Sequence, residues 1–185
     1  MLSELQRKNV ESVFNALDHD GNGLIERQDM TILSAGIIEV FELGEDSPHR
    51  AAVTATHEAW WEQIRSGADA DGDGSVTRAE FTAAVDRGLL TDPGYLDVVT
   101  AAANASFDAA DIDHDGFLDR TELVAVYSGA GIAAAIAYSA FNQMDTDGDG
   151  RVSRAEWQRS VHGVFTSSEP DMPGADLLGN ATQPQ

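Results

Sequence analysis

Four short stretches of the chain place acidic residues at alternate positions just ahead of a glycine. They read DHDGNGLIERQD, DADGDGSVTRAE, DIDHDGFLDRTE and DTDGDGRVSRAE. We call them loops 1 to 4, at residues 18–29, 69–80, 111–122 and 145–156. Carboxylates this close repel one another, by about 1 kcal/mol for two charges ~4 Å apart in water. A multivalent cation between them would remove that cost, so each stretch is predicted to bind a cation.

The order of residue types within each loop indicates calcium. Ca²⁺ takes about six to eight oxygen ligands, and loops of this pattern supply them from positions 1, 3, 5, 7, 9 and 12, position 7 through its backbone carbonyl. The glycine at position 6 allows the sharp turn, which needs a positive φ. The predicted ligands are Asp18, Asp20, Asn22, Leu24, Glu26 and Asp29 in loop 1; Asp69, Asp71, Asp73, Ser75, Thr77 and Glu80 in loop 2; Asp111, Asp113, Asp115, Phe117, Asp119 and Glu122 in loop 3; and Asp145, Asp147, Asp149, Arg151, Ser153 and Glu156 in loop 4.

Loop 1 differs from the others because it ends in Asp29 where they end in glutamate. A side chain one methylene shorter is expected to reach the ion through one oxygen, which favours a six-coordinate shell. Mg²⁺ demands near-octahedral six-coordination. Glu26, at position 9, is long enough to compensate by binding directly. We therefore expect up to four calcium ions, with magnesium possible above all at Asp18–Asp29.

Helix capping is an alternative explanation for part of the pattern. The segments TRAE, DRTE and SRAE, which end loops 2, 3 and 4, are also capping boxes, with a capping side chain three residues before a glutamate. Capping alone does not explain three acidic residues ahead of the glycine. Both roles are therefore expected together, with each loop ending where a helix begins.

The flanking sequence predicts an all-α fold of four helix–loop–helix units. Apolar residues recur at helical spacing before each loop, and Gly and Pro end helices at 43–48, 89–94 and 128–131. Phe14, Phe107 and Phe141 precede loops 1, 3 and 4 at the same offset, but Arg65 takes that place before loop 2. The apolar face of that helix is expected to be shifted, and Gly67 to fray its end.

The apolar residue at position 8 of each loop predicts how the units pair. Ile25, Val76, Leu118 and Val152 suit short two-stranded contacts between loops 1 and 2 and between loops 3 and 4. The expected organisation is an N-terminal pair at 1–90, a C-terminal pair at 91–166 and an irregular tail at 167–185. The apolar segment ADLLGN in this tail either docks onto the body or frays, and the sequence favours neither.

Charge and composition restrict the partners. The chain of 185 residues has 32 acidic residues against 11 basic ones, a formal net charge of −21. This excess disfavours nucleic acid and anionic membranes. It has no cysteine, no visible signal peptide and no apolar run near the roughly 20 residues that span a bilayer. We expect a cytoplasmic monomer that binds calcium ions; a protein partner is possible.

Several segments resemble the calerythrin and sarcoplasmic calcium-binding protein family of EF-hand proteins. They are FNALDHDGNGLIERQD with its closing aspartate, AWWEQI, AFNQMDTDGDG and DLLG. The loop spacing is also similar, with 51 residues between the starts of loops 1 and 2 and 34 between those of loops 3 and 4. The resemblance implies a compact globule of two face-to-face pairs, a covering C-terminal segment and a buffering role. Loop 2 is complete here, whereas it is commonly degenerate in calerythrin-like proteins.

Three functions remain open at this point. A calcium buffer is favoured because the chain has only four methionines, unlike the Met-rich grooves of adaptable sensors. Its large aromatic residues are expected to form a fixed core: Trp60, Trp61, Phe81, Phe107, Phe141 and Trp157. A calcium-dependent regulator is the alternative, and a photoprotein-like or other enzyme is remote. The histidines are expected to be solvated, and no catalytic arrangement stands out, so we predict that the protein is not an enzyme.

Overall fold

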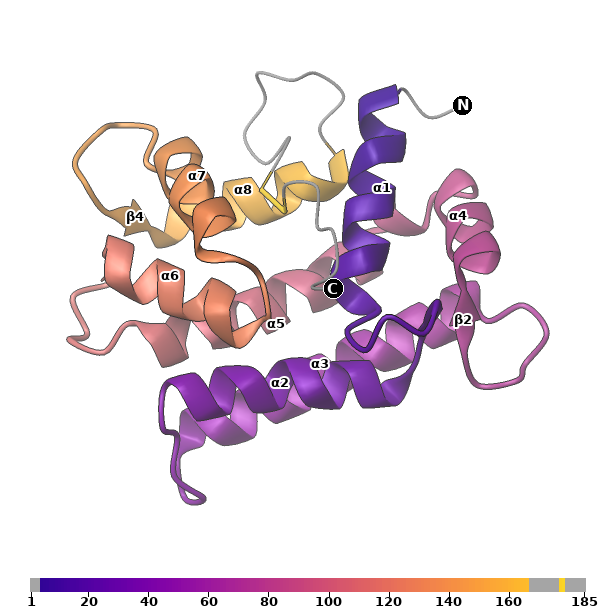
Figure 1. Cartoon of the computed structure of the whole chain (residues 1–185), viewed down its shortest axis with the longest axis horizontal. Coiled ribbons are helices and arrows are strands. Elements are labelled where there is room, and N and C mark those ends of the chain that lie inside the picture. The colour runs from indigo at the N-terminus through magenta and orange to yellow at the C-terminus, as the bar shows by residue number, and fades with distance from the viewer. Residues whose placement is uncertain (1–3, 167–176, 179–185) are drawn as a thin grey trace.

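Each acidic loop lies between two helices in the computed structural model, which describes residues 4–166 and 177–178 (Figure 1). Eight α-helices occur in these residues, and the predicted all-α fold of four helix–loop–helix units is confirmed. The helices are α1 (Glu4–Leu17), α2 (Arg27–Val40), α3 (Pro48–Ala68), α4 (Arg78–Asp86), α5 (Pro93–Ala110), α6 (Arg120–Gly129), α7 (Ala134–Met144) and α8 (Arg154–Thr166). A short 3₁₀-helix, η1 (Leu89–Thr91), lies between α4 and α5.

The linkers between units end and start helices through local chemistry. Ser47 and Asp92 cap α3 and α5, and their side chains accept hydrogen bonds from the backbone of Arg50 and Tyr95. A proline follows each cap at the first helical turn, where its missing N–H costs nothing. These caps fall at two of the three predicted breaks. At the second break, residues 89–91 form η1, whose Leu89 and Leu90 are buried.

The loops pair through two-residue strands, as position 8 predicted. β1 (Leu24–Ile25) pairs antiparallel with β2 (Val76–Thr77), and β3 (Phe117–Leu118) pairs with β4 (Val152–Ser153). Ile25 lies opposite Val76, and Leu118 lies opposite Val152. All four side chains are fully buried. Each strand pair therefore joins two loops and fixes their relative position.

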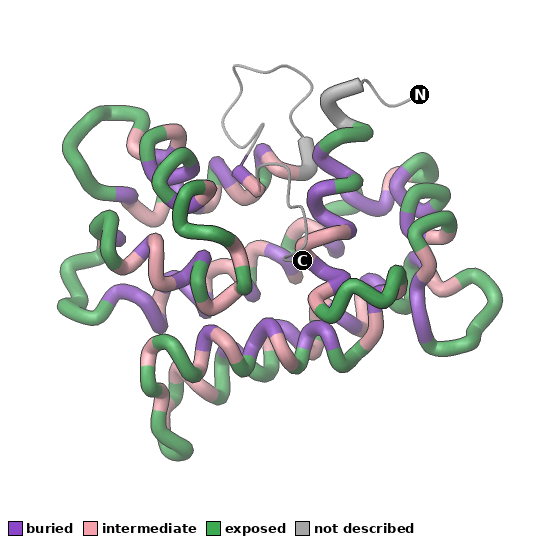
Figure 2. The backbone as a smooth tube through the Cα atoms, viewed as in Figure 1, coloured by how far each residue is buried: buried purple, intermediate pink, exposed green. Residues whose placement is uncertain are grey.

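Helices of the first two units pack directly against helices of the last two. α3 lies along α5 and α2 lies along α6, and the buried residues in Figure 2 follow these facing sides. Two hydrophobic clusters cross this boundary. Tyr95 and Val99 of α5 join the cluster of the first two units, while Ile37 and Val53 of α2 and α3 join that of the last two.

For the helix before loop 2, the expected fraying at Gly67 is wrong and the expected shift of the apolar face is confirmed. Gly67 does not fray it, because α3 continues to Ala68 and the Asp69 N–H still bonds to the Arg65 carbonyl. A Cβ on Gly67 would lie 2.7 Å from Leu89 Cδ1, so the glycine lets η1 pack closely against the helix. The shifted apolar face is confirmed: Trp61 and Ile64 are buried while Arg65 is exposed.

The aromatic core is confirmed with one exception, since Trp60 is only partly buried. The expectation that the histidines are solvated is wrong for His57, which lies on α3 and is buried with 4% of its surface exposed. Of the tail, only Leu177 and Leu178 are described. Leu177 is buried, and its carbonyl accepts a hydrogen bond of 3.3 Å from the Tyr127 hydroxyl; the rest of 167–185 lies outside the described residues.

Candidate metal centres

The four loops share one hydrogen-bond framework within their first seven residues. The N–H of the glycine at position 6 donates to the aspartate at position 1 at 3.0 or 3.1 Å in every loop. The N–H at position 5 donates to the aspartate at position 3, and that at position 7 to the side chain at position 5. These bonds hold the side chains at positions 1, 3 and 5 against the backbone of their own loop. The arrangement of these predicted ligands therefore depends on residues within the loop.

The carboxylate at position 12 closes each loop from the far side. It accepts hydrogen bonds from the backbone N–H of position 2 and of position 9 in all four loops. Position 9 in turn accepts from the N–H of position 12 in loops 2, 3 and 4, as the predicted capping boxes require. The residue that closes the loop and the residue that begins the exiting helix therefore hold each other in place.

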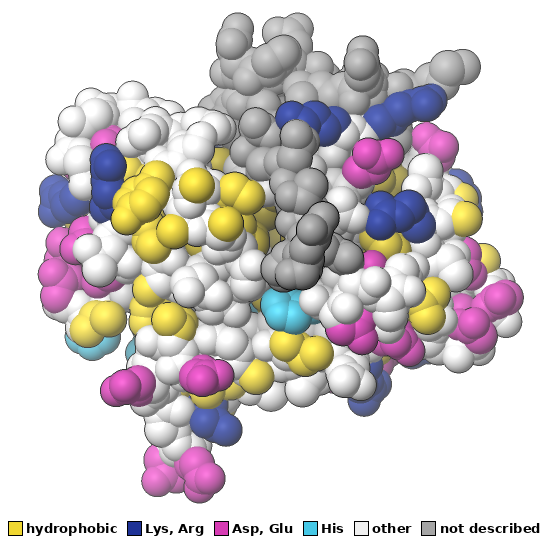
Figure 3. All heavy atoms as spheres, in the orientation of Figure 1, with side chains coloured by type: hydrophobic (Ala, Val, Ile, Leu, Met, Phe, Trp, Pro, Cys, Tyr) yellow, Lys and Arg dark blue, Asp and Glu magenta, His cyan; other side chains and the backbone are white. Residues whose placement is uncertain are grey.

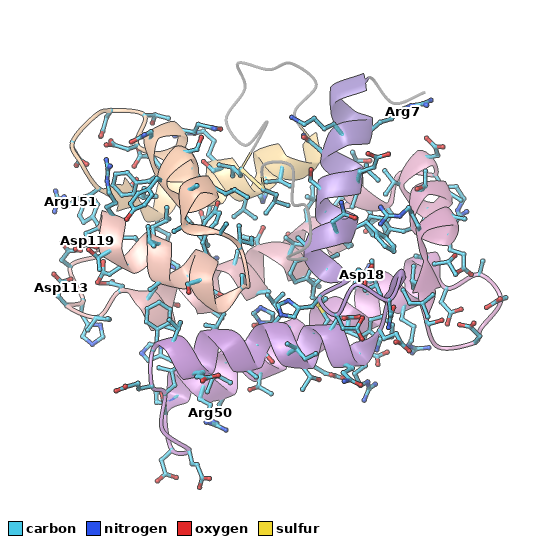
Figure 4. The ribbon with its side chains drawn as sticks, in the orientation of Figure 1. Arg7, Asp18, Arg50, Asp113, Asp119 and Arg151 are labelled. Atoms are coloured by element: carbon cyan, nitrogen blue, oxygen red, sulfur yellow. The ribbon has the colours of Figure 1, made fainter. Side chains whose placement is uncertain are left out.

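Carboxylate oxygens gather within 4.8 Å of one another in each loop. The groups are Asp18, Asp20 and Asp29; Asp69, Asp71 and Asp73; Asp111, Asp113 and Glu122; and Asp145, Asp147 and Glu156. Loop 2 is the exception in that its Glu80 stands outside the group. In Figure 4, Asp113, Asp119 and Arg151 lie near one another at the edge formed by loops 3 and 4, and Asp18 lies at the start of loop 1.

Two buried oxygens within these groups show that the donor sets fit a cation. Oδ1 of Asp18 and Oδ1 of Asp145 have no hydrogen-bond partner among the described residues. Both belong to the aspartate at position 1 of their loops. A buried carboxylate oxygen without a partner costs about 1–3 kcal/mol or more, whereas a bound cation would satisfy it. Hard oxygen ligands in this number suit Ca²⁺ or Mg²⁺.

Asp29 reaches the cluster of loop 1 despite its shorter side chain. Its Oδ1 accepts from the His19 N–H at 3.0 Å and its Oδ2 from the Glu26 N–H at 2.7 Å, as the longer glutamates do elsewhere. Glu26 does not join the group; its Oε2 accepts a hydrogen bond of 3.1 Å from the Asn22 side chain. Direct ligation by Glu26 therefore remains a prediction, as do the carbonyl ligands at position 7.

The carboxylates at position 12 differ in the direction in which their surroundings shift the pKa. Burial would raise the pKa of Glu156, but hydrogen bonds from the backbone and hydroxyl groups of Ser153 and Thr146 outweigh it and lower the pKa to about 2. Burial raises the pKa of Glu122, and the nearby charges of Asp119 and Asp113 add to that rise. Burial likewise raises the pKa of Asp29. Loop 4 is thus built to keep its carboxylate charged.

Acid is expected to release calcium from loops 1 and 3 before loop 4. Calcium binds the deprotonated carboxylate, so a raised pKa lets protons compete at higher pH, while Glu156 resists protonation until about pH 2. The amide signals of Gly23, Gly116 and Gly150 in NMR spectra would follow each loop as the pH is lowered. This order would be contradicted if the Gly150 signal moved away from its calcium-bound position first, or if the signals of all the loops moved at the same pH.

A feature that sequence reasoning missed is the arginine at position 10 of every loop. Arg78 lies 4.2 Å above the ring of Phe14, Arg120 4.8 Å above Phe141 and Arg154 4.3 Å above Phe107, so each covers the phenylalanine before the paired loop. The fourth arginine, Arg27, has no such ring to cover, because the helix before loop 2 has Arg65 where the other entering helices have phenylalanine.

Arg27 instead forms an ion pair of 2.7 Å with Glu62, which also holds Arg65. The helix before loop 2 has Arg65 in place of phenylalanine, and this replacement is thereby explained. The ion pairs of Glu62 with Arg27 and Arg65 take the place of the cation–π contact found at the other loops. Repetition of arginine at position 10 was a signal in the sequence that could have revealed these contacts. Each contact of this kind is worth about 0.5–1 kcal/mol at an exposed site.

Comparison with known proteins places the fold and the loops in a family. A model described as an EF-hand domain pair matches residues 100–156, and a model described as EF hand matches 10–32 and 68–85. A probable calcium-binding protein, CML17 of Oryza sativa subsp. japonica, is 32% identical over 85% of this chain and 93% of its own length. The chain belongs to the EF-hand calcium-binding proteins.

Three further likenesses are to calerythrin, a Streptomyces coelicolor calcium-binding protein and a sarcoplasmic calcium-binding protein. Calerythrin of Saccharopolyspora erythraea is 26% identical over 87% of this chain and 92% of its own length. The solved structure of a Streptomyces coelicolor calcium-binding protein is 29% identical, with a TM-score of 0.78 over 87% of this chain and 98% of that one. An amphioxus sarcoplasmic calcium-binding protein, at 17% identity and a TM-score of 0.71 over the whole of both chains, shares the fold. The predicted resemblance to calerythrin and sarcoplasmic proteins is confirmed.

Proposed function

We propose that this EF-hand protein is a calcium buffer that takes up to four ions, with loop 1 also accepting magnesium. The observation that carries the proposal is the burial of the apolar faces of the two halves against each other. α2 and α3 of the first half cover α6 and α5 of the second, and among described residues the exposed large hydrophobic side chains are Val40, Ile112 and Tyr138. A buffer needs no surface on which to bind a target.

The surface of the described part supports this interpretation. Figure 3 shows acidic side chains scattered over the visible face, with hydrophobic ones gathered mainly over α6 and α7. No helix of the described residues is long and apolar enough to cross a membrane. We further propose that the protein is a cytoplasmic monomer without catalytic activity, organised as an N-terminal pair at 1–90, a C-terminal pair at 91–166 and a tail.

Calcium-dependent regulation is the second candidate. The solved Streptomyces coelicolor relative is described as the structural basis for prokaryotic calcium-mediated regulation. In a regulator, calcium would open one pair and expose an apolar surface for a protein partner. The same helices would then present their buried faces to that partner rather than to each other.

Calorimetric titration with calcium, with and without millimolar magnesium, separates the two candidates when it is combined with binding of a hydrophobic dye. A buffer is expected to show several sites, at least one weakened by magnesium, and to bind less dye when calcium is present. Greater dye binding with calcium would favour the regulator and overturn the buffer. Glu156→Gln should lose one site, whereas Glu11→Gln, at an exposed acid of α1, should retain every site.

A further inference from the structure

A largely apolar cavity of about 180 Å³ lies between the two halves of the molecule. Helices of both halves line it, including Leu33 and Ile37 of α2, Val99 of α5 and Val126 of α6, and Leu177 also contributes. An apolar cavity of about 150 Å³ in another protein holds benzene and otherwise stays dry. The space here therefore matches one aromatic ring with a small substituent.

Polar groups on the cavity wall have their hydrogens committed within the protein. The indole N–H of Trp60 donates to the Tyr95 hydroxyl and that of Trp157 to the Ala103 carbonyl, both at 3.2 Å. The Ser106 hydroxyl donates to the Ala102 carbonyl at 3.2 Å, and the Tyr127 hydroxyl donates to Leu177. A water molecule typically makes about three hydrogen bonds when buried. Here it would find acceptors but no free donor among these groups.

His57 is the exception on this wall. Its Nδ1 lies 2.8 Å from the Val53 carbonyl, which can only accept, so Nδ1 carries the hydrogen. Burial lowers the pKa of His57, so the ring is neutral and Nε2 keeps a free lone pair. Nε2 lies on the ring edge away from its own helix, the ring lines the cavity, and no described residue donates to it.

We propose that this cavity binds a single-ring aromatic molecule with one hydrogen-bond donor, whose O–H or N–H donates to His57 Nε2. The ring would occupy the apolar space, and the donor would satisfy His57 Nε2, to which no described residue donates a hydrogen bond. Phenol has this chemistry, and toluene is a matched probe of nearly the same shape without the donor. The proposal concerns a site apart from the acidic loops and does not depend on whether the protein buffers calcium.

Titration calorimetry of the calcium-loaded protein with phenol and with toluene tests the proposal. The preference for phenol over toluene is expected to be about tenfold greater in the parent than in His57→Leu, because the variant lacks the acceptor. Ala102→Leu, which fills the cavity from α5, should bind neither probe. Absence of phenol binding by the parent, an unchanged preference in His57→Leu, or full phenol binding by Ala102→Leu would each overturn the proposal.

NMR of the parent protein provides a test that needs no variant to fold. The ¹⁵N signal of His57 Nε2 is expected to shift when phenol is added, because a hydrogen bond to the lone pair changes its shielding, and to shift much less with toluene. Equal shifts with both probes would indicate that the ring enters the cavity without the proposed hydrogen bond, and would overturn the assignment of His57 as the recognition group.

Discussion

Removal of calcium with excess chelator is expected to lower the melting temperature of this protein more than any single substitution. An ion that binds only the folded state stabilises it by about 2.7 kcal/mol per site at a free concentration 100 times its Kd. For a chain of this size that corresponds to roughly 5–10 °C in Tm for each occupied loop. Four acidic clusters within a chain of net charge −21 make the loss cumulative, since the carboxylates in each cluster repel one another without the ion.

Scanning calorimetry in excess calcium, in chelator, and in chelator with sodium chloride at raised ionic strength separates two contributions. Salt screens the general repulsion between exposed charges but does not fill the loops. Salt alone is therefore expected to restore only a small part of the lost Tm. Identical Tm values with calcium and with chelator would contradict binding linked to folding, and full recovery in salt would show that net charge rather than site occupancy is responsible.

The acidic loops could be predicted from sequence because their structure is local. The bonds from position 6 to position 1 and from position 2 to position 12 all lie within one loop of twelve residues. A related local signal was overlooked. Position 4 has a positive φ in every loop, and it is glycine in loops 1, 2 and 4 but His114 in loop 3, at φ 58°. Glycine is favoured there for the same steric reason as at position 6.

Features that depend on contacts between distant segments could not be predicted in the same way. The buried environment of His57 is supplied partly by α5 and α6, whose positions do not follow from the residues around it. The irregular helix before loop 2 was noticed from Arg65, but its explanation required the ion pairs of Glu62 with Arg65 and, 35 residues away, with Arg27. Sequence pattern thus predicted the site residues, while contacts between distant segments determine how deeply each of them is buried and which ion pairs form around them.

Gly36→Ala is expected to destabilise the protein by about 2–3 kcal/mol, because the contact between α2 and α6 has no room for a methyl group. A Cβ at Gly36 would lie 2.0 Å from the Gly129 carbonyl oxygen and 3.1 Å from its carbon. These are backbone atoms of the other half and cannot rotate away, so the two helices would have to separate. Alanine gains up to about 1 kcal/mol in helix propensity, which offsets part of the larger packing cost.

Urea unfolding in excess calcium measures this effect, with Gly44→Ala as the matched control. A Cβ at Gly44, in the linker between α2 and α3, would meet nothing within 4 Å, so this variant is expected to stay within about 0.5 kcal/mol of the parent. Calcium titration followed through the NMR amide signals of Gly23 in loop 1 and Gly116 in loop 3 would measure the affinity of each loop. It would show whether separating α2 from α6 also weakens calcium binding in the loops that precede these helices. A Gly36→Ala variant as stable as the parent would mean that the helices slide past one another at little cost, and that the two halves do not depend on this contact.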